Sequence, residues 1–196
     1  ISEAVRSLNC EEFFRVLLPN EAEHETALDW LSVLSAPDPV AALILGGVPG
    51  TGKTMVSSAC AAFFGGELGP YDKAIREKFN GCLIRTRLIF LDEKTRIRGA
   101  NDAFRSLTAN RIHSMEPKGK TDVSVHGTYR IICATQNEDP FRLYSEDLTP
   151  AGQAALGERI IRIEVAAAAK SWLAERGGSL GMTRYWVTDK DGGPGD

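Results

Sequence analysis

One run, Gly47-Val48-Pro49-Gly50-Thr51-Gly52-Lys53-Thr54, constrains this chain more than any other segment. Its glycines, lysine and threonine stand at the positions of a phosphate-binding loop. The apolar residues 41–45 before it predict a buried strand, and residues 55–64 after it predict a helix. Glycines let a backbone wrap closely around an anion, and the start of the following helix offers positive N–H groups. The run therefore predicts a strand, a loop and a helix built around phosphate.

Two side chains of this loop have specific roles in such a site. Lys53 would reach the β- and γ-phosphates of bound ATP, and the Thr54 hydroxyl would ligate Mg²⁺. The other loop residues would hold the phosphates through their backbone N–H groups. The alternative is an ordinary glycine-rich turn, which would not require a strand before it and a helix after it.

Length and charge limit the other possibilities. The chain has 196 residues, enough for one α/β domain with a core, and its net charge of −3 gives no overall basic field for nucleic acid. We find no signal peptide and no apolar stretch long enough to span a bilayer, so we expect a cytoplasmic protein with no membrane partner. Because the chain begins at Ile1 and not at Met, we expect a segment of a longer protein.

Cysteine and histidine do not form a metal-binding pattern in the sequence. The cysteines are scattered without metal-ligand spacing, and the histidines add no ligand pattern to them. These residues are Cys10, Cys60, Cys82 and Cys133, and His24, His113 and His126. We therefore expect reduced thiols and no structural zinc.

Apolar runs alternate with helical patterns along the rest of the chain. Further buried strands are expected at residues 88–91 and 129–134, and a strand with one exposed face at 159–165. The expected helices lie within residues 2–34, 71–80 and 166–176, and the expected turns at Gly65-Gly66 and Gly69-Pro70. This alternation predicts an α/β fold with a mostly parallel central sheet flanked by helices. The expected domains are a helical N-terminal segment (1–38), a core (39–176) and a partly flexible C-terminal extension (177–196).

The strand at 88–91 ends in two carboxylates, Asp92 and Glu93. Ligands of open α/β sheets bind at the carboxyl ends of the strands. Asp92 would hold the Mg²⁺ shell and Glu93 would polarise the attacking water, a division of work that suits hydrolysis better than a small-molecule kinase. The alternative is a strand that ends in two solvated acids.

The strand at 129–134 is followed by Thr135, Gln136 and Asn137. An amide between the two preceding motifs would hydrogen-bond both the γ-phosphate and the lytic water, and Asn137 is the candidate for this sensing role. The alternative is an Asn that only forms the turn before Pro140.

A hairpin is expected between these strands, at residues 115–128, because Pro and Gly force turns and Val123 and Val125 alternate. Its candidate nucleic-acid contacts are Lys118, Lys120 and His126. The alternative is that the lysines are only solvated and that His126 is a partly buried residue at a strand end.

Arg159 stands just before the last predicted strand, where an arginine would reach the γ-phosphate of a neighbouring subunit as a finger in trans. Arg162 is the second candidate. The alternative is a surface arginine paired with Glu158 or Glu164.

These motifs, in their order, resemble a known family. The order is the phosphate-binding loop, Lys78-Phe79-Asn80-Gly81-Cys82-Leu83, the Asp92-Glu93 strand, Glu116-Pro117-Lys118-Gly119, Ala134-Thr135-Gln136-Asn137-Glu138 and Glu158-Arg159. Together they are similar to the superfamily-3 type helicase domain of phage, viral and plasmid primase-helicases, over residues 20–165. The stretch Leu28-Asp29-Trp30-Leu31 is similar to the helix that precedes the loop in that family.

The resemblance implies an AAA+-like P-loop NTPase core that hydrolyses ATP with Mg²⁺. It implies a ring, usually a hexamer, in the full-length protein, with ATP between subunits and hairpins that grip single-stranded DNA. Lys53, Thr54, Asp92, Glu93, Asn137, Lys118 and Arg159 would take the corresponding roles. One departure concerns the finger: the family often has two adjacent arginines and an aromatic, whereas Ile160 and Ile161 follow Arg159.

The function expected from this resemblance is an ATP-dependent DNA helicase or translocase motor in the replication of a mobile element, in a bacterial or phage-infected cell. No primase motif is present in the sequence. Three alternatives remain: an AAA+ ATPase that remodels protein assemblies without unwinding DNA, a nucleotide-binding oligomerisation module with negligible catalysis, and a small-molecule kinase.

Overall fold

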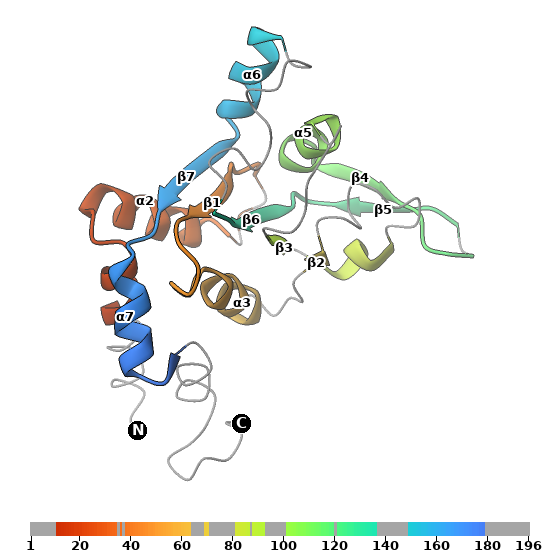
Figure 1. Ribbon diagram of the computed structural model, residues 1–196. Helices are drawn as coiled ribbons and strands as arrows, with labels where there is room; N and C mark the ends of the chain where they lie inside the picture. Colours follow the sequence, from red (N-terminus) through yellow and green to blue (C-terminus); the bar gives the residue numbers. More distant parts are fainter. Residues whose placement is uncertain are drawn as a thin grey trace.

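The computed structural model describes residues 11–34, 36, 38–63, 69–70, 81–86, 88–92, 101–119, 121–136 and 149–178 (Figure 1). The strands are β1 (Ala42–Gly46), β2 (Gly69–Pro70), β3 (Leu88–Asp92), β4 (Ile112–Met115), β5 (Val123–His126), β6 (Arg130–Ala134) and β7 (Ile160–Glu164). The helices are residues 11–17, α2 (Glu21–Ser32), α3 (Lys53–Phe63), the 3-10 helix η1 (Gly81–Arg85), α5 (Asn101–Ala109), α6 (Pro150–Gly157) and α7 (Ala168–Glu175).

The central sheet has five parallel strands in the order β2-β3-β6-β1-β7. Strand β6 therefore lies between β1, which leads into the phosphate-binding loop, and β3, which ends in Asp92. A second, two-stranded sheet pairs β4 with β5 antiparallel. The predicted α/β class with a mostly parallel sheet is confirmed.

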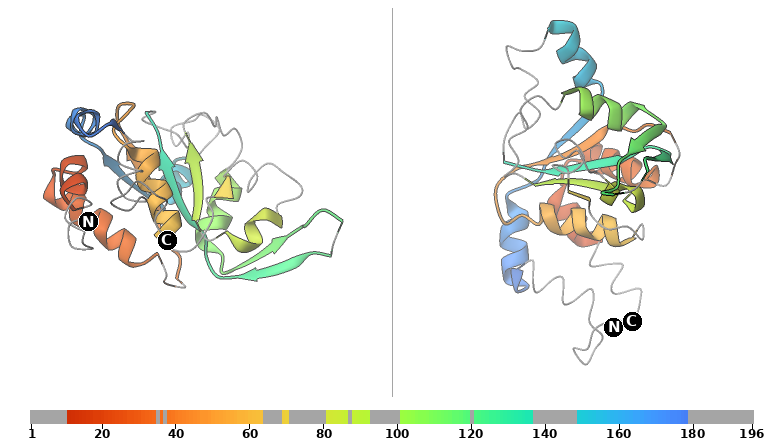
Figure 2. Two further views of the ribbon diagram at one scale, coloured as in Figure 1. Left: turned by 90° about the horizontal axis from the view of Figure 1, so that it is seen from below. Right: turned by 90° about the vertical axis from the view of Figure 1, so that its right-hand side faces the viewer.

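The sheet is buried on both faces because alternate residues of its strands point to opposite sides. In β1, Leu43 and Leu45 join one apolar cluster with residues of α2, α3 and α7. Ala42 and Ile44 join a second cluster with Phe104 and other residues of the opposite face. Seen edge-on, α3 and α5 lie on opposite sides of the sheet (Figure 2). The continuous apolar runs of these strands follow from this double burial.

The N-terminal helices pack into the same core as the strands. Phe13, Leu17 and Trp30 are almost fully buried in the cluster that contains α3 and α7. The Trp30 indole N–H also donates to the Ala41 carbonyl oxygen at 2.8 Å, just before β1. Helix α2 begins at Glu21, because the Asn20 side chain accepts from the Glu23 N–H and caps its first turn.

The β4–β5 hairpin projects away from the central sheet (Figures 1 and 2). Val123 pairs with Met115 and Val125 with His113, so the expected hairpin is confirmed with β4 as its first strand. Gly119, with φ of +72°, lies in the turn at its tip. The Pro117 that precedes this turn lies so close to Gly81 of η1 that a Cβ there would come within 2.8 Å of Pro117 Cα.

One element differs from the sequence prediction, and two α-helices were missed. Gly69-Pro70 was expected as a turn, but it forms β2 and pairs with Ile89 and Phe90. An edge strand tolerates proline because one side of it needs no ladder hydrogen bonds. The missed helices are α5 and α6. Thr149 caps α6 with Pro150 in its first turn, a helix-start signal that the sequence does contain.

Some predictions fall outside the described residues: the helix at 71–80, the turn at Gly65-Gly66 and most of the C-terminal extension. The stop of α7 at Gly177-Gly178 is confirmed, because both glycines have positive φ, of +84° and +71°. Of the helices that the structure describes, none combines the length and apolar character needed to cross a bilayer.

Candidate nucleotide-binding site

The loop at residues 47–52 connects the end of β1 directly to the start of α3. Gly47, Gly50 and Gly52 have φ of +126°, +84° and +92°, values that only glycine adopts without strain. The first hydrogen bond of the helix runs from the Val56 N–H to the Gly52 carbonyl oxygen at 3.0 Å. The N-terminal turn of α3, with its positive dipole end, therefore adjoins the loop, which is the arrangement that binds phosphate.

Lys53 points back into this loop. Its ammonium donates hydrogen bonds to the carbonyl oxygens of Gly47 and Val48, both at 2.7 Å, and lies 3.5 Å from Thr51 Oγ1. Only 7% of Lys53 is exposed, whereas Thr54 is exposed at the first turn of α3. The loop thus holds a buried cation at its centre and offers a hydroxyl at its rim.

Each positive-φ glycine of the loop lies against the segment that runs from β7 into α7. Gly52 also lies against the helix at residues 11–17. A Cβ at Gly47 would lie 2.8 Å from Val165 Cγ2, and one at Gly52 would lie 2.8 Å from Phe13 Cζ and 3.1 Å from Leu173 Cδ1. The three atoms nearest to a Cβ at Gly50 would all be side-chain carbons of Lys170, at 3.5 to 3.6 Å. The glycines therefore serve close packing as well as backbone conformation.

The strand ends bring the other predicted motifs to the same edge of the sheet. Leu45 is in register with Ala134, and Ala134 is in register with Asp92. Two strand spacings, about 10 Å, therefore separate the base of the loop from Asp92. Thr135, the residue after β6, is buried and donates its N–H to the Leu45 carbonyl oxygen at 3.0 Å. The segment that leads to Asn137 thus starts between the loop and Asp92.

Several predicted site residues are not described. Glu93, Asn137 and Lys120 lie outside the described residues, and for Asp92 only the backbone position at the end of β3 is described. Their predicted roles in hydrolysis, sensing and nucleic-acid binding stay predictions.

Of the two candidate arginines, Arg159 lies just before β7 and Arg162 lies in the middle of it, in register with Ile44. Arg159 precedes the strand, and its carbonyl oxygen accepts from the Ala42 N–H, at the start of β1, at 2.8 Å. Its guanidinium donates to the Ala155 carbonyl oxygen of α6. Arg159 is therefore at the sheet edge opposite the loop, about 13 Å along β1 from Gly46.

Arg162 lies near the chain's own loop. Its Nε donates to Glu164 Oε1 at 2.7 Å, and both side chains cover Gly46, where a Cβ would lie 2.7 Å from the Arg162 guanidinium. This ion pair matches the alternative to a finger role, in which the arginine lies at the surface and pairs with Glu164. The Arg162 side chain therefore lies beside the chain's own phosphate-binding loop, whereas that of Arg159 is bound to α6 at the other end of the strands.

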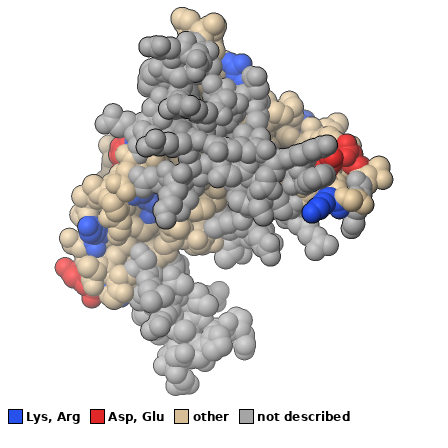
Figure 3. All heavy atoms as spheres, turned by 45° about the vertical axis from the view of Figure 1, so that its right-hand side comes forward, with Lys and Arg blue, Asp and Glu red and all other residues tan. Residues whose placement is uncertain are grey.

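The hairpin carries the candidate nucleic-acid contacts. Lys118 is exposed in the turn at the tip, and His126 is exposed at the base, paired with Ile112. The two are therefore at opposite ends of the hairpin and do not form one patch. On the face shown in Figure 3, the described Lys and Arg side chains are scattered, and basic and acidic atoms adjoin at the right-hand end.

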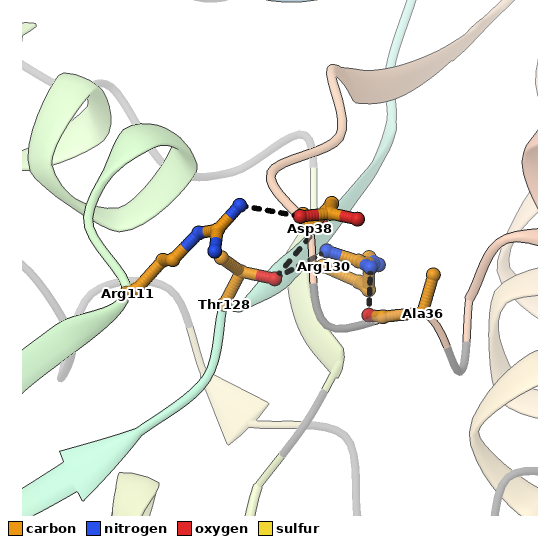
Figure 4. Close-up of polar contacts among 5 residues, drawn as sticks. All are labelled: Ala36, Asp38, Arg111, Thr128 and Arg130. Carbon is orange, nitrogen blue, oxygen red and sulfur yellow. Dashed lines mark hydrogen bonds and ion pairs between the residues drawn. The ribbon is translucent and has the colours of Figure 1, made fainter.

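The base of the hairpin is fixed by an arginine that sequence reasoning missed (Figure 4). Arg130, 2% exposed, donates to Thr128 Oγ1 at 2.7 Å and to the carbonyl oxygens of Val33 and Ala36 at 3.1 and 2.5 Å. Thr128 in turn donates to the Asp38 carbonyl oxygen at 3.1 Å. These contacts hold the α2–β1 connection against the chain between β5 and β6. The sequence does contain a signal for this role, because Arg130 is a lone charged residue within an apolar run.

The thiols that the structure describes are buried. Cys60 and Cys133 are free cysteines in the two apolar clusters, and burial raises the pKa of Cys60 to about 11. Neither thiol lies at the loop, so both serve the core.

Residues 45–149 match a family described as a family of unknown function, DUF5906. The chain belongs to DUF5906. The matched range contains the loop, β3, the hairpin and β6, whereas Arg159 and α7 lie beyond it. No curated protein sequence matches the chain.

Solved structures share the fold of this DUF5906 chain. One is an apo structure of the NrS-1 C-terminal region, at 14% identity and a TM-score of 0.63, covering 92% of this chain and 45% of that one. A second NrS-1 structure, of residues 305–718, gives 15% and 0.57 over 92% and 44% of the two chains. JCV helicase with a bound small molecule gives 15% and 0.56 over 89% and 52%. The chain spans about half the length of each.

These likenesses bear out the mostly parallel α/β fold that the sequence motifs predicted, and one of the neighbours, JCV helicase, is a helicase. At such low identity they show the arrangement of strands and helices.

Proposed function

We propose that this domain is the ATP-hydrolysing motor of a DNA helicase or translocase that acts in the replication of a mobile element. The observation that carries the proposal is the alignment of Leu45, Ala134 and Asp92 across three neighbouring strands. It gathers the phosphate-binding loop, the approach to Asn137 and the end of β3 at one edge of the sheet. The helicase fold of one structural neighbour, JCV helicase, supports it.

The loop has the features needed to bind the phosphates of ATP. Its glycines and the start of α3 supply N–H donors, and Lys53 supplies a charge that a phosphate oxygen would attract away from Gly47 and Val48. Thr54 and Asp92 are the residues that would hold Mg²⁺, which would neutralise charge that develops on the phosphates. Glu93 would orient and polarise the attacking water, and Asn137 would sense the γ-phosphate.

Arg159 supports the proposal that hydrolysis needs a second subunit. Since it lies at the sheet edge opposite its own loop, it would reach only the loop of a neighbour. A ring, with a hexamer as the expected form of the full-length protein, would supply that neighbour around the whole assembly. The projecting hairpin, with Lys118 at its tip, would then meet single-stranded DNA.

The experiment that tests this function is steady-state ATP hydrolysis at high protein concentration, with and without single-stranded DNA. Glu93→Gln is the control, because it keeps the shape of the side chain and removes the carboxylate that would polarise water. We expect stimulation by DNA in the parent protein and loss of turnover, with ATP still bound, in the variant. Normal turnover in Glu93→Gln would refute the assignment of the hydrolytic residue.

A second outcome would favour the protein-remodelling ATPase. The described cations do not gather into a patch on the face of Figure 3, and the chain has a net charge of −3. Hydrolysis that depends on Glu93 but does not respond to single-stranded DNA would support that function. Unwinding of duplex DNA by the full-length protein would exclude it.

A further inference from the structure

Helix α7 lies along the phosphate-binding loop and is held there by several contacts. Val165, just before the helix, lies against Gly47, and Leu173 lies against Gly52. The Ala166 N–H donates to the Leu17 carbonyl oxygen at 2.9 Å, which ties the start of α7 to the helix at residues 11–17. The position of α7 relative to the loop is therefore set by packing on both sides.

Lys170 occupies the side of α7 that faces the loop. It precedes Leu173 by three residues, so both side chains lie on one helix face. The Cγ, Cδ and Cε atoms of Lys170 lie 3.5 to 3.6 Å from the position of a Cβ at Gly50. Because three successive stem carbons follow the loop, the ammonium one bond beyond Cε also lies beside it. Any side chain larger than hydrogen at residue 50 would contact this stem.

The ammonium of Lys170 makes no ion pair or hydrogen bond with another described residue. The arginines of nearby segments differ in this respect: Arg162 pairs with Glu164, and Arg176 with Glu12 at 3.4 Å. Lys170 is exposed, so its charge remains hydrated. An uncompensated cation beside a loop that already holds Lys53 favours an anion at this place.

We propose that Lys170 is a second cation of the nucleotide site, contributed in cis by α7, and that it binds the phosphate groups of the nucleotide. The inference rests on the proposed nucleotide binding of the loop. A bound polyphosphate would lie between Lys53 on its inner side and Lys170 across Gly50. Lys170 acts in binding, and neither the hydrolytic step nor a neighbouring subunit is needed for its effect.

The test is equilibrium binding of a fluorescent ADP analogue, with inorganic tripolyphosphate as competitor. Lys170→Met removes the charge and keeps an aliphatic stem against Gly50, whereas Lys170→Arg keeps the charge. We expect Lys170→Met to raise the Kd for ADP about 5- to 10-fold, as for one partly exposed charge-assisted contact, and Lys170→Arg to stay within about twofold. The difference between Lys170→Met and the parent should shrink as salt is raised.

Two control variants distinguish a failure of the Lys170 proposal from a failure of the proposed nucleotide binding at the loop. Arg15→Met removes an exposed cation of the neighbouring helix, whose partner is Glu11, and we expect it to leave the Kd unchanged. Lys53→Met removes the central cation of the loop. If neither the parent nor Lys53→Met binds the analogue, or both bind it equally well, the proposed nucleotide site is wrong and the role of Lys170 is wrong with it.

The remaining outcomes test only the role of Lys170, because in them nucleotide binding at the loop is established. If binding depends on Lys53 but Lys170→Met binds ADP as tightly as the parent, Lys170 is a packing residue and the inference is overturned. If Lys170→Met weakens ADP binding but leaves tripolyphosphate competition unchanged, the contact is not to phosphate and the inference is overturned in that form. A parallel loss for both ligands supports it.

Discussion

The Nζ atom of Lys53 lies 2.7 Å from the carbonyl oxygen of Gly47 and donates a hydrogen bond to it. A second bond of equal length runs to Val48, so the loop holds its own lysine through two carbonyl dipoles. A phosphate would have to compete with these neutral acceptors. Charged acceptors form the stronger hydrogen bonds, so the competition favours the phosphate.

The first prediction concerns this lysine. Lys53→Met should weaken binding of ATP and ADP by at least about 100-fold, since it removes the buried charge and its charge-assisted bonds to the phosphates. Fluorescence titration with a labelled nucleotide measures the change, and circular dichroism checks that the fold is kept. Unchanged affinity in a folded variant would show that nucleotide does not bind at this loop.

Arg159→Ala should leave nucleotide binding within about twofold of the parent and lower ATP turnover by at least about 100-fold, if it acts as a finger in trans. The sharper measurement mixes Arg159→Ala with Lys53→Met in the full-length protein. Each inactive subunit supplies what the other lacks, so activity should return in the mixture. Failure of mixing, with assembly shown to occur, would count against action in trans.

Lys118→Ala should weaken binding to single-stranded DNA and reduce the slope of log K against log salt by about 0.7, the value for one contact to a single strand. The exposed position of Lys118 at the hairpin tip is the reason. Lys118→Arg is the matched control and should retain the slope. An equal slope in all three proteins would make Lys118 a solvated loop residue.

Arg130→Met should lower the free energy of unfolding by about 2–4 kcal/mol, because two backbone carbonyls and the Thr128 hydroxyl lose a buried donor. Arg111→Met is the control. It breaks the ion pair of Arg111 with Asp38, whose side chains are 67% and 65% exposed, and should cost less than about 1 kcal/mol. Urea denaturation compares the two, and equal losses would contradict the buried role of Arg130.

His113 predicts a pH dependence of stability. It is buried at the base of the hairpin, with its ring against Tyr129, and its Nε2 has no hydrogen-bond partner among the described residues. Burial lowers the pKa of His113 below its ordinary value of 6.5, and a backbone hydrogen bond with Asn110 opposes this effect. The unfolded chain therefore binds the proton more readily, and stability falls as the pH drops below about 6.5.

Urea denaturation between about pH 7.5 and pH 5.5 measures this effect in the parent and in His113→Phe. Each unit by which the pKa is lowered is worth about 1.4 kcal/mol at most. The parent should lose more stability than the variant over this range. Equal losses would mean that other groups account for the acid sensitivity.

Some elements follow from local pattern alone. The loop at 47–52 was predicted because glycines, lysine and the flanking strand and helix are all contiguous in sequence. Helix α6 is different: Thr149 and Pro150 signal its start, but its apolar positions are few, and among its described residues only Leu156 is buried. Gly69-Pro70 was misassigned because its pairing with β3 is a contact between distant residues, which turn propensity does not contain.

The sequence by itself determined the phosphate-binding loop, the buried strands and the resemblance to superfamily-3 helicase domains, because these depend on neighbouring residues and their spacing. Only the tertiary structure decided that β6 lies between β1 and β3, that Arg159 faces away from its own loop, and that Lys170 adjoins Gly50. Strand order and helix docking are set by contacts between segments far apart in the chain. Such contacts form by burial of apolar surface, which has no fixed sequence spacing.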